Sequence, residues 1–104
     1  MSFSVTENIG GKVILRIKSD LDTYGSSLQF KDALEDIYKS GEKEVVLDLD
    51  MVTRINSFGT GKILMFYRRF KNSGGDLYVK TPLNENVKEV FEELKIDKLL
   101  KEFS

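Results

Sequence analysis

The sequence contains no cysteine, no histidine and no tryptophan, and it has a single proline among its 104 residues. Without cysteine the chain cannot form disulfides or offer a thiol nucleophile, and without histidine it has no imidazole to bind a metal or to transfer protons near neutral pH. These absences exclude zinc fingers, histidine-based catalytic triads and most acid–base enzymes. Because only carboxylates remain as possible general bases, an enzyme is the least favoured class of function, and we expect no metal and no cofactor.

The charge is balanced, with 16 lysines and arginines against 17 aspartates and glutamates. A net charge of -1 gives no electrostatic attraction to nucleic acid or to a membrane surface, so neither is expected as a direct partner. No stretch approaches the roughly 18 apolar residues of a membrane span, and the first 30 residues do not resemble a signal peptide. The length predicts a single domain over residues 1–104, in the cytoplasm.

The first half of the chain predicts a hairpin, a helix and a buried strand. Alternating apolar residues in Phe3 to Thr6 and Lys12 to Lys18 indicate two strands, and the glycines of the turn Asn8 to Gly11 favour their antiparallel pairing. Apolar residues recur at helical spacing from Ser26 to Lys39. The run Val45 to Leu49 is short and apolar on both faces, which is typical of a central strand.

The second half predicts a helix over Ser57 to Lys71, ended by a left-handed residue at Gly74, and a short strand over Leu77 to Val79. A third helix is expected after a cap at Asn84, and one or two further helical turns are expected over Ile96 to Phe103. Strand–helix–strand units pair their strands in parallel through right-handed crossovers. The sequence thus predicts an α/β fold with a four-stranded mixed sheet, an antiparallel N-terminal hairpin and three to four helices.

A glycine-containing turn, Asn56 to Lys62, lies between the central strand and the second helix, where backbone N–H groups could face an anion. It is not a P-loop, because Asn56 occupies the position of the first glycine and Ile63 that of the magnesium-binding hydroxyl. Judged by position alone, Ser57 is a helix cap, and Asp20 and Asp22 belong to a loop that caps the first helix.

Four blocks of sequence together resemble the STAS domain of bacterial anti-sigma factor antagonists. In the block VVLDLDMVTRINSFGTG, Val45 to Gly61, an apolar strand and a short linker lead into a pattern similar to the family's Asp-Ser-Ser/Thr-Gly-Leu-Gly. Ser19 to Asp22 is similar to its Gly-Glu-Leu-Asp, Asn72 to Leu77 to its Arg-Gly-Gly-x-Leu, and Leu94 to Leu99 to its Thr-Gly-Leu-Asp-x-Leu. The order and spacing of these blocks extend the resemblance over nearly the whole chain, which implies the STAS fold.

The resemblance also implies a function. Such proteins capture an anti-sigma factor kinase and so free a sigma factor, until the kinase phosphorylates a serine, which corresponds here to Ser57. A serine phosphatase is a further expected partner. The surface expected to bind the partner comprises Asp20, Asp22, Asn56, Ser57, Phe58, Gly59, Thr60 and Lys62.

Three residues around this serine depart from the family pattern. Asn56 replaces an aspartate, Phe58 replaces a serine or threonine, and Thr60 replaces a leucine. Phe58 lies outside the apolar stripe of its helix, so it either packs over the loop Asp20 to Tyr24 or projects as an apolar anchor for a partner. The resemblance is also compatible with an alternative function, that of a STAS module without phosphorylation that senses a small anion or nucleotide, or that scaffolds a regulatory or lipid-transport complex.

Overall fold

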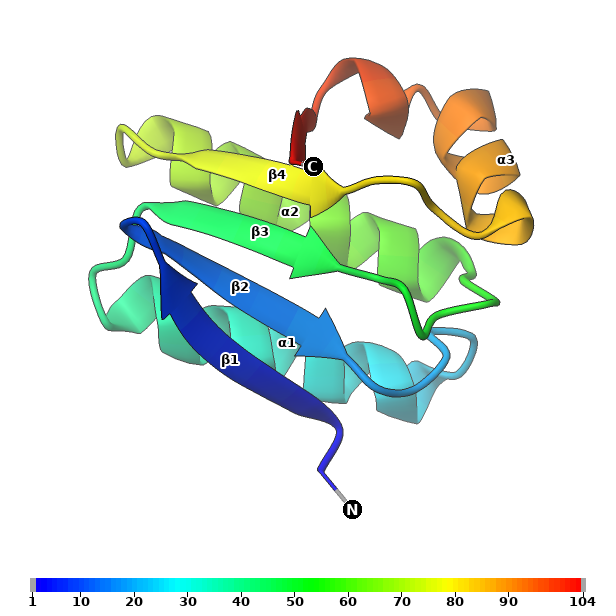
Figure 1. Cartoon of the computed structure of the whole chain (residues 1–104). Coiled ribbons are helices and arrows are strands. Elements are labelled where there is room, and N and C mark those ends of the chain that lie inside the picture. The colour runs from blue at the N-terminus through cyan, green and yellow to red at the C-terminus, as the bar shows by residue number, and fades with distance from the viewer. Residues whose placement is uncertain (1, 104) are drawn as a thin grey trace.

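A computed structural model describes residues 2–103, and Figure 1 shows its single five-stranded sheet with strand order β1-β2-β3-β4-β5. Strands β1 and β2 form the predicted antiparallel hairpin, and each later strand is parallel to its neighbour. The mixed α/β architecture predicted from the sequence is confirmed. The strands are β1 (Ser4–Ile9), β2 (Lys12–Ile17), β3 (Glu44–Asp48), β4 (Asp76–Lys80) and β5 (Lys101–Phe103).

The two long helices, α1 (Tyr24–Lys39) and α2 (Ser57–Asn72), lie side by side behind one face of the sheet (Figure 1). Helix α3 (Glu85–Glu93) follows β4 and lies beyond its end. Apolar residues at helical spacing face the strands, so the core fills the layer between helices and sheet. Its largest fully buried side chains include Phe30, Leu34, Phe66, Phe70, Leu15, Leu47 and Leu77.

The opposite face of the sheet carries a ladder of charges. The carboxylate of Asp48 is only 2% exposed, and its Oδ2 lies 3.0 Å from Arg16 Nε and 3.7 Å from Lys80 Nζ. Lys80 also pairs with Asp50 at 2.9 Å. Burial alone would raise the pKa of Asp48, but the Asp50 N–H and the two cations hold it below its usual value. These pairs join the carboxyl ends of β2, β3 and β4.

The end of the chain corrects one prediction. Only Ile96–Lys98 is helical, as one 3₁₀ turn, and the following strand β5 pairs with β4, so the sheet has five strands rather than four. Lys95, at the start of that turn, has a left-handed backbone with φ of 60°, which separates the turn from α3. Ile96 and Leu100 are buried in the core, where they hold the 3₁₀ turn and the segment before β5 in place. Because these two residues are four positions apart, their spacing resembles that of a helix.

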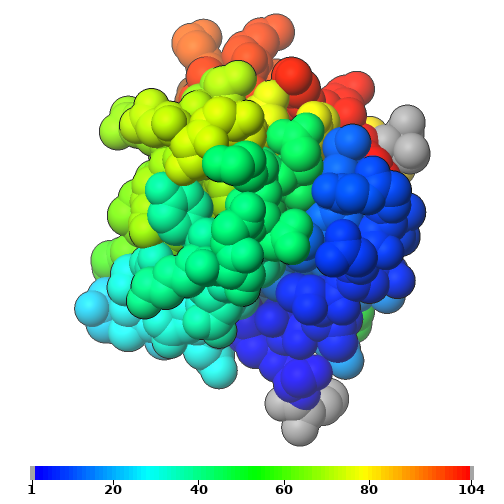
Figure 2. Space-filling view, turned by 90° about the vertical axis from the view of Figure 1, so that its left-hand side faces the viewer, coloured from blue at the N-terminus to red at the C-terminus, as the bar shows by residue number. Residues whose placement is uncertain are grey.

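The two ends of the sheet differ in character. The β1–β2 turn and the connections α1–β3 and α2–β4 close one end, which faces the viewer in Figure 2. The carboxyl ends of the parallel strands β2 and β3 point to the other end, where the loops before α1 and α2 lie. In the described part of the chain, residues 2–103, no helix is both long enough and apolar enough to cross a membrane.

Candidate functional site

The two loops that follow β2 and β3 are fastened to each other directly before α2. Leu21 and Ile55 form an isolated parallel bridge, in which the Leu21 N–H donates to the Arg54 carbonyl at 2.9 Å and the Asn56 N–H donates to the Leu21 carbonyl at 3.0 Å. Because Leu21 is fully buried, the bridge is anchored in the core. We call the bridged segments, residues 20–22 and 53–56, the bridged loops.

Asp20 strengthens this connection. Its Oδ1 accepts the Thr53 N–H at 2.7 Å, the Thr53 hydroxyl at 3.1 Å and the Arg54 N–H at 3.2 Å. Burial alone would raise the pKa of Asp20, but these donors together lower it. One of the two carboxylates predicted to meet a partner is therefore already hydrogen-bonded to the neighbouring loop. Asp22 lies 3.9 Å from Arg54, and its side chain is one-third exposed.

Asn56 caps helix α2. Its extended backbone precedes the helix, and its Oδ1 accepts the N–H groups of Phe58 at 3.0 Å and Gly59 at 3.2 Å. The interpretation of Ser57 as the cap is therefore wrong, because Ser57 is the first helical residue and its side chain is exposed. The cap lies one residue earlier because the bridge to Leu21 ends the extended segment at Asn56.

Gly59 and Thr60, which were predicted to contact the partner, are buried. A Cβ atom at position 59 would lie 2.9 Å from Ile55 Cγ1 and 3.1 Å from the Leu21 carbonyl oxygen, so glycine lets the first turn of α2 rest on the bridged loops. The Thr60 hydroxyl donates to the backbone carbonyl of Asn56 at 3.2 Å. Gly59 and Thr60 therefore shape the first turn of α2 from below the surface.

Phe58 combines features of both alternatives considered for it. Its ring packs edge-to-face on Tyr24 with 5.4 Å between the centroids, yet 49% of the residue stays exposed. Tyr24 is 60% exposed, and Leu28, one turn further along α1, is 37% exposed. We call Tyr24, Leu28 and Phe58 the apolar patch. The sequence predicted only Phe58, because Tyr24 meets its ring through contact between distant segments, and Leu28 lies one helical turn from Tyr24 on α1.

The start of α2 thus presents an exposed serine hydroxyl at the positive end of a 16-residue helix, next to the apolar patch. Lys62, one turn further along, is half-buried. Among residues 2–103, no group of three or more acidic side chains is arranged to hold a metal ion. The start of α2 therefore offers exposed apolar side chains and one exposed hydroxyl on the same part of the surface.

Comparisons with known proteins agree with this architecture. The family model described as "STAS domain" matches residues 3–104. A Thermotoga maritima protein, TM1081, crystallised as a candidate anti-sigma factor antagonist, has a TM-score of 0.87 and 24% identity, covering 97% of this chain and 86% of its own.

More distant structures share the same fold. Phosphorylated SpoIIAA of Bacillus has a TM-score of 0.72 at 16% identity, over 97% of this chain and 91% of its own. The murine anion transporter Slc26a9 has a TM-score of 0.65 at 17% identity, over 89% of this chain and 16% of its own. Because the family model spans nearly every residue, the chain belongs to the STAS domain family.

Proposed function

We propose that this protein is an anti-sigma factor antagonist that binds an anti-sigma factor kinase and is switched off when that kinase phosphorylates Ser57. The observation that carries the proposal is the exposed Ser57 hydroxyl, held at the first position of α2 beside the apolar patch. Support comes from the family and from similar structures, one of a candidate anti-sigma factor antagonist and others of SpoIIAA in phosphorylated and unphosphorylated forms.

The electrostatics of the site are suited to such a switch. A phosphate carries about -1.5 to -2 charges at neutral pH, and the positive end of α2 stabilises negative charge. Asn56 is neutral where the family has an aspartate, so no carboxylate at the cap would repel the phosphate. The fold would therefore tolerate the modification, whereas an apolar interface formed over Phe58 would be disrupted by the desolvation of that charge.

The alternative function, in which the turn binds a free anion or nucleotide, has weaker support. An anion at a helix start is held by free backbone N–H groups. In this protein the Phe58 and Gly59 N–H groups already donate to the Asn56 side chain, so an incoming anion would compete with an intact cap. A phosphate attached covalently to Ser57 needs no such competition.

The first experiment incubates the protein with its cognate kinase and ATP and maps the phosphate by mass spectrometry. We expect a single phosphate on Ser57, removed by a serine phosphatase, and no modification of the Ser57→Ala variant. Thr53 is a useful internal control, because its hydroxyl is engaged with Asp20. Phosphate on Thr53 or Ser73 with Ser57 unmodified would disprove the assignment.

A second experiment separates charge from shape at the same position. Ser57→Asp should abolish capture of the kinase, whereas Ser57→Asn, which has nearly the same shape without the charge, should retain most of it. Both variants should unfold at nearly the same temperature as the wild type, because Ser57 is exposed and does not cap α2. Equal loss of binding in both variants would mean that bulk, and not charge, is sensed there.

Phe58 tests the apolar patch. Phe58→Ser restores the family's usual residue, and we expect it to weaken kinase binding by about 1 to 3 kcal/mol through lost burial of the ring. Because Phe58 is already half exposed, stability should fall by less than affinity does. Isothermal titration and thermal unfolding of this one variant give both quantities. If the variant is destabilised but its affinity is unchanged, Phe58 contributes to packing and not to binding of the partner.

A further inference from the structure

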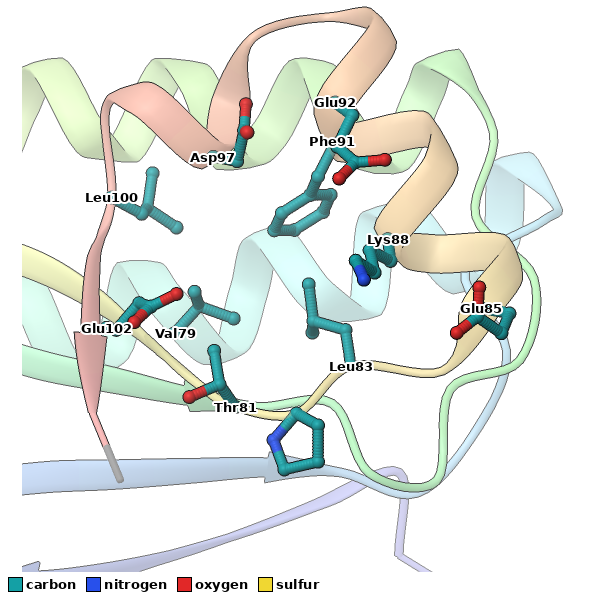
Figure 3. A pocket seen from close by; sticks show the side chains of 11 residues that line it. Val79, Thr81, Leu83, Glu85, Lys88, Phe91, Glu92, Asp97, Leu100 and Glu102 are labelled. Atoms are coloured by element: carbon teal, nitrogen blue, oxygen red, sulfur yellow. The ribbon is translucent and has the colours of Figure 1, made fainter.

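A separate cavity of about 320 Å³ lies on the β5 side of the molecule, and no residue of the apolar patch lines it. It is enclosed by the end of β4, the segment Thr81–Leu83, helix α3 and strand β5 (Figure 3). A volume of this size is at the lower end of the range of small-molecule pockets. None of the residues predicted from the sequence as site residues lines this cavity.

The interior of the cavity is apolar. Val79, Leu83, Phe91 and Leu100 supply hydrocarbon surface from the sheet, the connecting segment, α3 and the 3₁₀ region, and the Phe91 ring extends into the space in Figure 3. Val79, Phe91 and Leu100 are each at most 4% exposed, so they belong to the packed core and give the cavity a preformed wall. Such a wall favours a ligand with a compact apolar body.

The rim of the cavity is acidic. Glu85, Glu92, Asp97 and Glu102 are exposed acidic residues of the lining, and Lys88 is the one basic residue in it. Within residues 2–103, none of these four carboxylates takes part in a salt bridge or a side-chain hydrogen bond. Their combined charge with Lys88 is -3, from four negative groups and one positive group. Several ion-pairing groups are thus free at the mouth of an apolar cavity.

Donors for an anionic ligand are scarce by comparison. The Thr81 N–H already donates to the Phe103 carbonyl at 3.1 Å, and Pro82 has no N–H. An anion could use Lys88 and the Thr81 hydroxyl, but it would lie close to four carboxylates, which like-charge repulsion opposes. A cation, in contrast, would be attracted by the four carboxylates and repelled only by Lys88.

From this combination we propose that the cavity binds a small organic ammonium ion, with its apolar body against Phe91 and Leu100 and its charged group among the carboxylates of the rim. The site is independent of Ser57, so it stands whether or not the phosphorylation switch exists. A hydrocarbon body would gain burial, while the ammonium group would stay partly hydrated and be attracted by the negative field.

The test uses matched probes and NMR of the intact chain. Titration with 2-phenylethylammonium should shift the methyl signals of Val79, Leu83 and Leu100, whereas 3-phenylpropanoate, which has a similar body and the opposite charge, should leave them nearly unchanged. Raising the salt concentration to about 1 M should weaken the binding, because exposed charges are then screened beyond about 3 Å.

Charge variants locate the attraction. Glu102→Gln should lower the affinity for the ammonium probe about two- to fivefold, as expected for the loss of one exposed ion pair. Lys88→Gln should raise that affinity by a similar factor. Glu93→Gln is the matched control, because Glu93 is an exposed residue of α3 outside the cavity lining. Thermal unfolding of each variant checks that the fold is retained.

Three results would overturn the proposal. The first is equal binding of the two probes, which would show that charge is not recognised. The second is an effect of Glu93→Gln as large as that of Glu102→Gln, which would show that only the overall charge of the protein matters. The third is methyl shifts produced by a basic peptide but not by the small ammonium probe, which would assign the surface to a protein partner.

Discussion

The cap of helix α2 allows a quantitative test of the site geometry. In Asn56→Ala the N–H groups of Phe58 and Gly59 lose the oxygen that accepts them at 3.0 and 3.2 Å. Removal of an N-cap costs about 0.5 to 2 kcal/mol, and we expect the upper half of that range because two donors are affected and one is partly buried. For a domain of about 100 residues, this loss lowers the melting temperature by roughly 4 to 8 °C per kcal/mol.

The matched variants are Ser57→Ala and Asn56→Asp. Ser57→Ala should change the free energy of unfolding by less than about 0.5 kcal/mol, because the exposed hydroxyl does not cap the helix. Asn56→Asp retains the acceptor and adds negative charge at the positive end of α2, so it should match the wild type or exceed it slightly. Urea unfolding of all three variants decides the matter. If Ser57→Ala loses as much stability as Asn56→Ala, the assignment of the cap is wrong.

Further variants test the packing and the ion pairs. Gly59→Ala should destabilise the protein by about 1 to 3 kcal/mol, because the added Cβ would overpack the first turn of α2. At Gly61 an added Cβ meets nothing within 4 Å, so Gly61→Ala should stabilise the protein by up to about 1 kcal/mol. Thermal unfolding measures both effects. Because the folded-state pKa of Asp48 is lowered, its contribution to stability is present above about pH 4 and is lost as the pH falls through the folded-state value. Urea titrations from pH 7 to pH 2.5 should therefore show a steeper loss of stability for the wild type than for Asp48→Asn. Arg69→Lys breaks the two-pronged pair with Glu35, at 2.9 and 2.7 Å, and should cost about 1 kcal/mol, with Lys71→Arg expected to change stability little in the same assay.

The fold was largely predictable because its main signals are local. The helical spacing of Phe30 and Leu34 in one helix, and of Phe66 and Phe70 in another, identified α1 and α2, since those side chains are the ones buried against the sheet. The apolar run of β3 was correctly interpreted as a central strand, because β3 is the middle strand of the sheet and its residues Val45, Val46 and Leu47 are all fully buried.

The missed features depend on contacts between distant segments. Strand β5 has only three residues, and it is a strand because Lys101 and Phe103 lie in register with Tyr78 and Lys80, which no local pattern reveals. The position of the α2 cap was missed for a related reason. Asparagine and serine are both good caps, and the choice between Asn56 and Ser57 depends on the bridge to Leu21, more than thirty residues earlier in the chain.

For the candidate site, the sequence predicted the position of Ser57 in the fold better than it predicted the exposure of the neighbouring residues. Family resemblance placed Ser57 at the start of a helix, where the structure has it. It also grouped residues of different kinds, because a motif does not distinguish side chains that face solvent from those that hold the turn in place. Ser57 and Phe58 are exposed, whereas Gly59 and Thr60 are buried and Asp20 is bonded to the neighbouring loop.

The bridged loops also influence how fast and how selectively any partner could dock at the start of α2. The Leu21–Ile55 bridge and the hydrogen bonds to the Asp20 carboxylate fix the backbone that leads into Ser57. This surface is therefore ordered before a partner binds. Little conformational entropy is then lost on association, which favours rigid docking over folding upon binding. The same rigidity has a second effect. The backbone cannot shift to move a charge on Ser57 away from the interface, so the partner must accommodate that charge or dissociate.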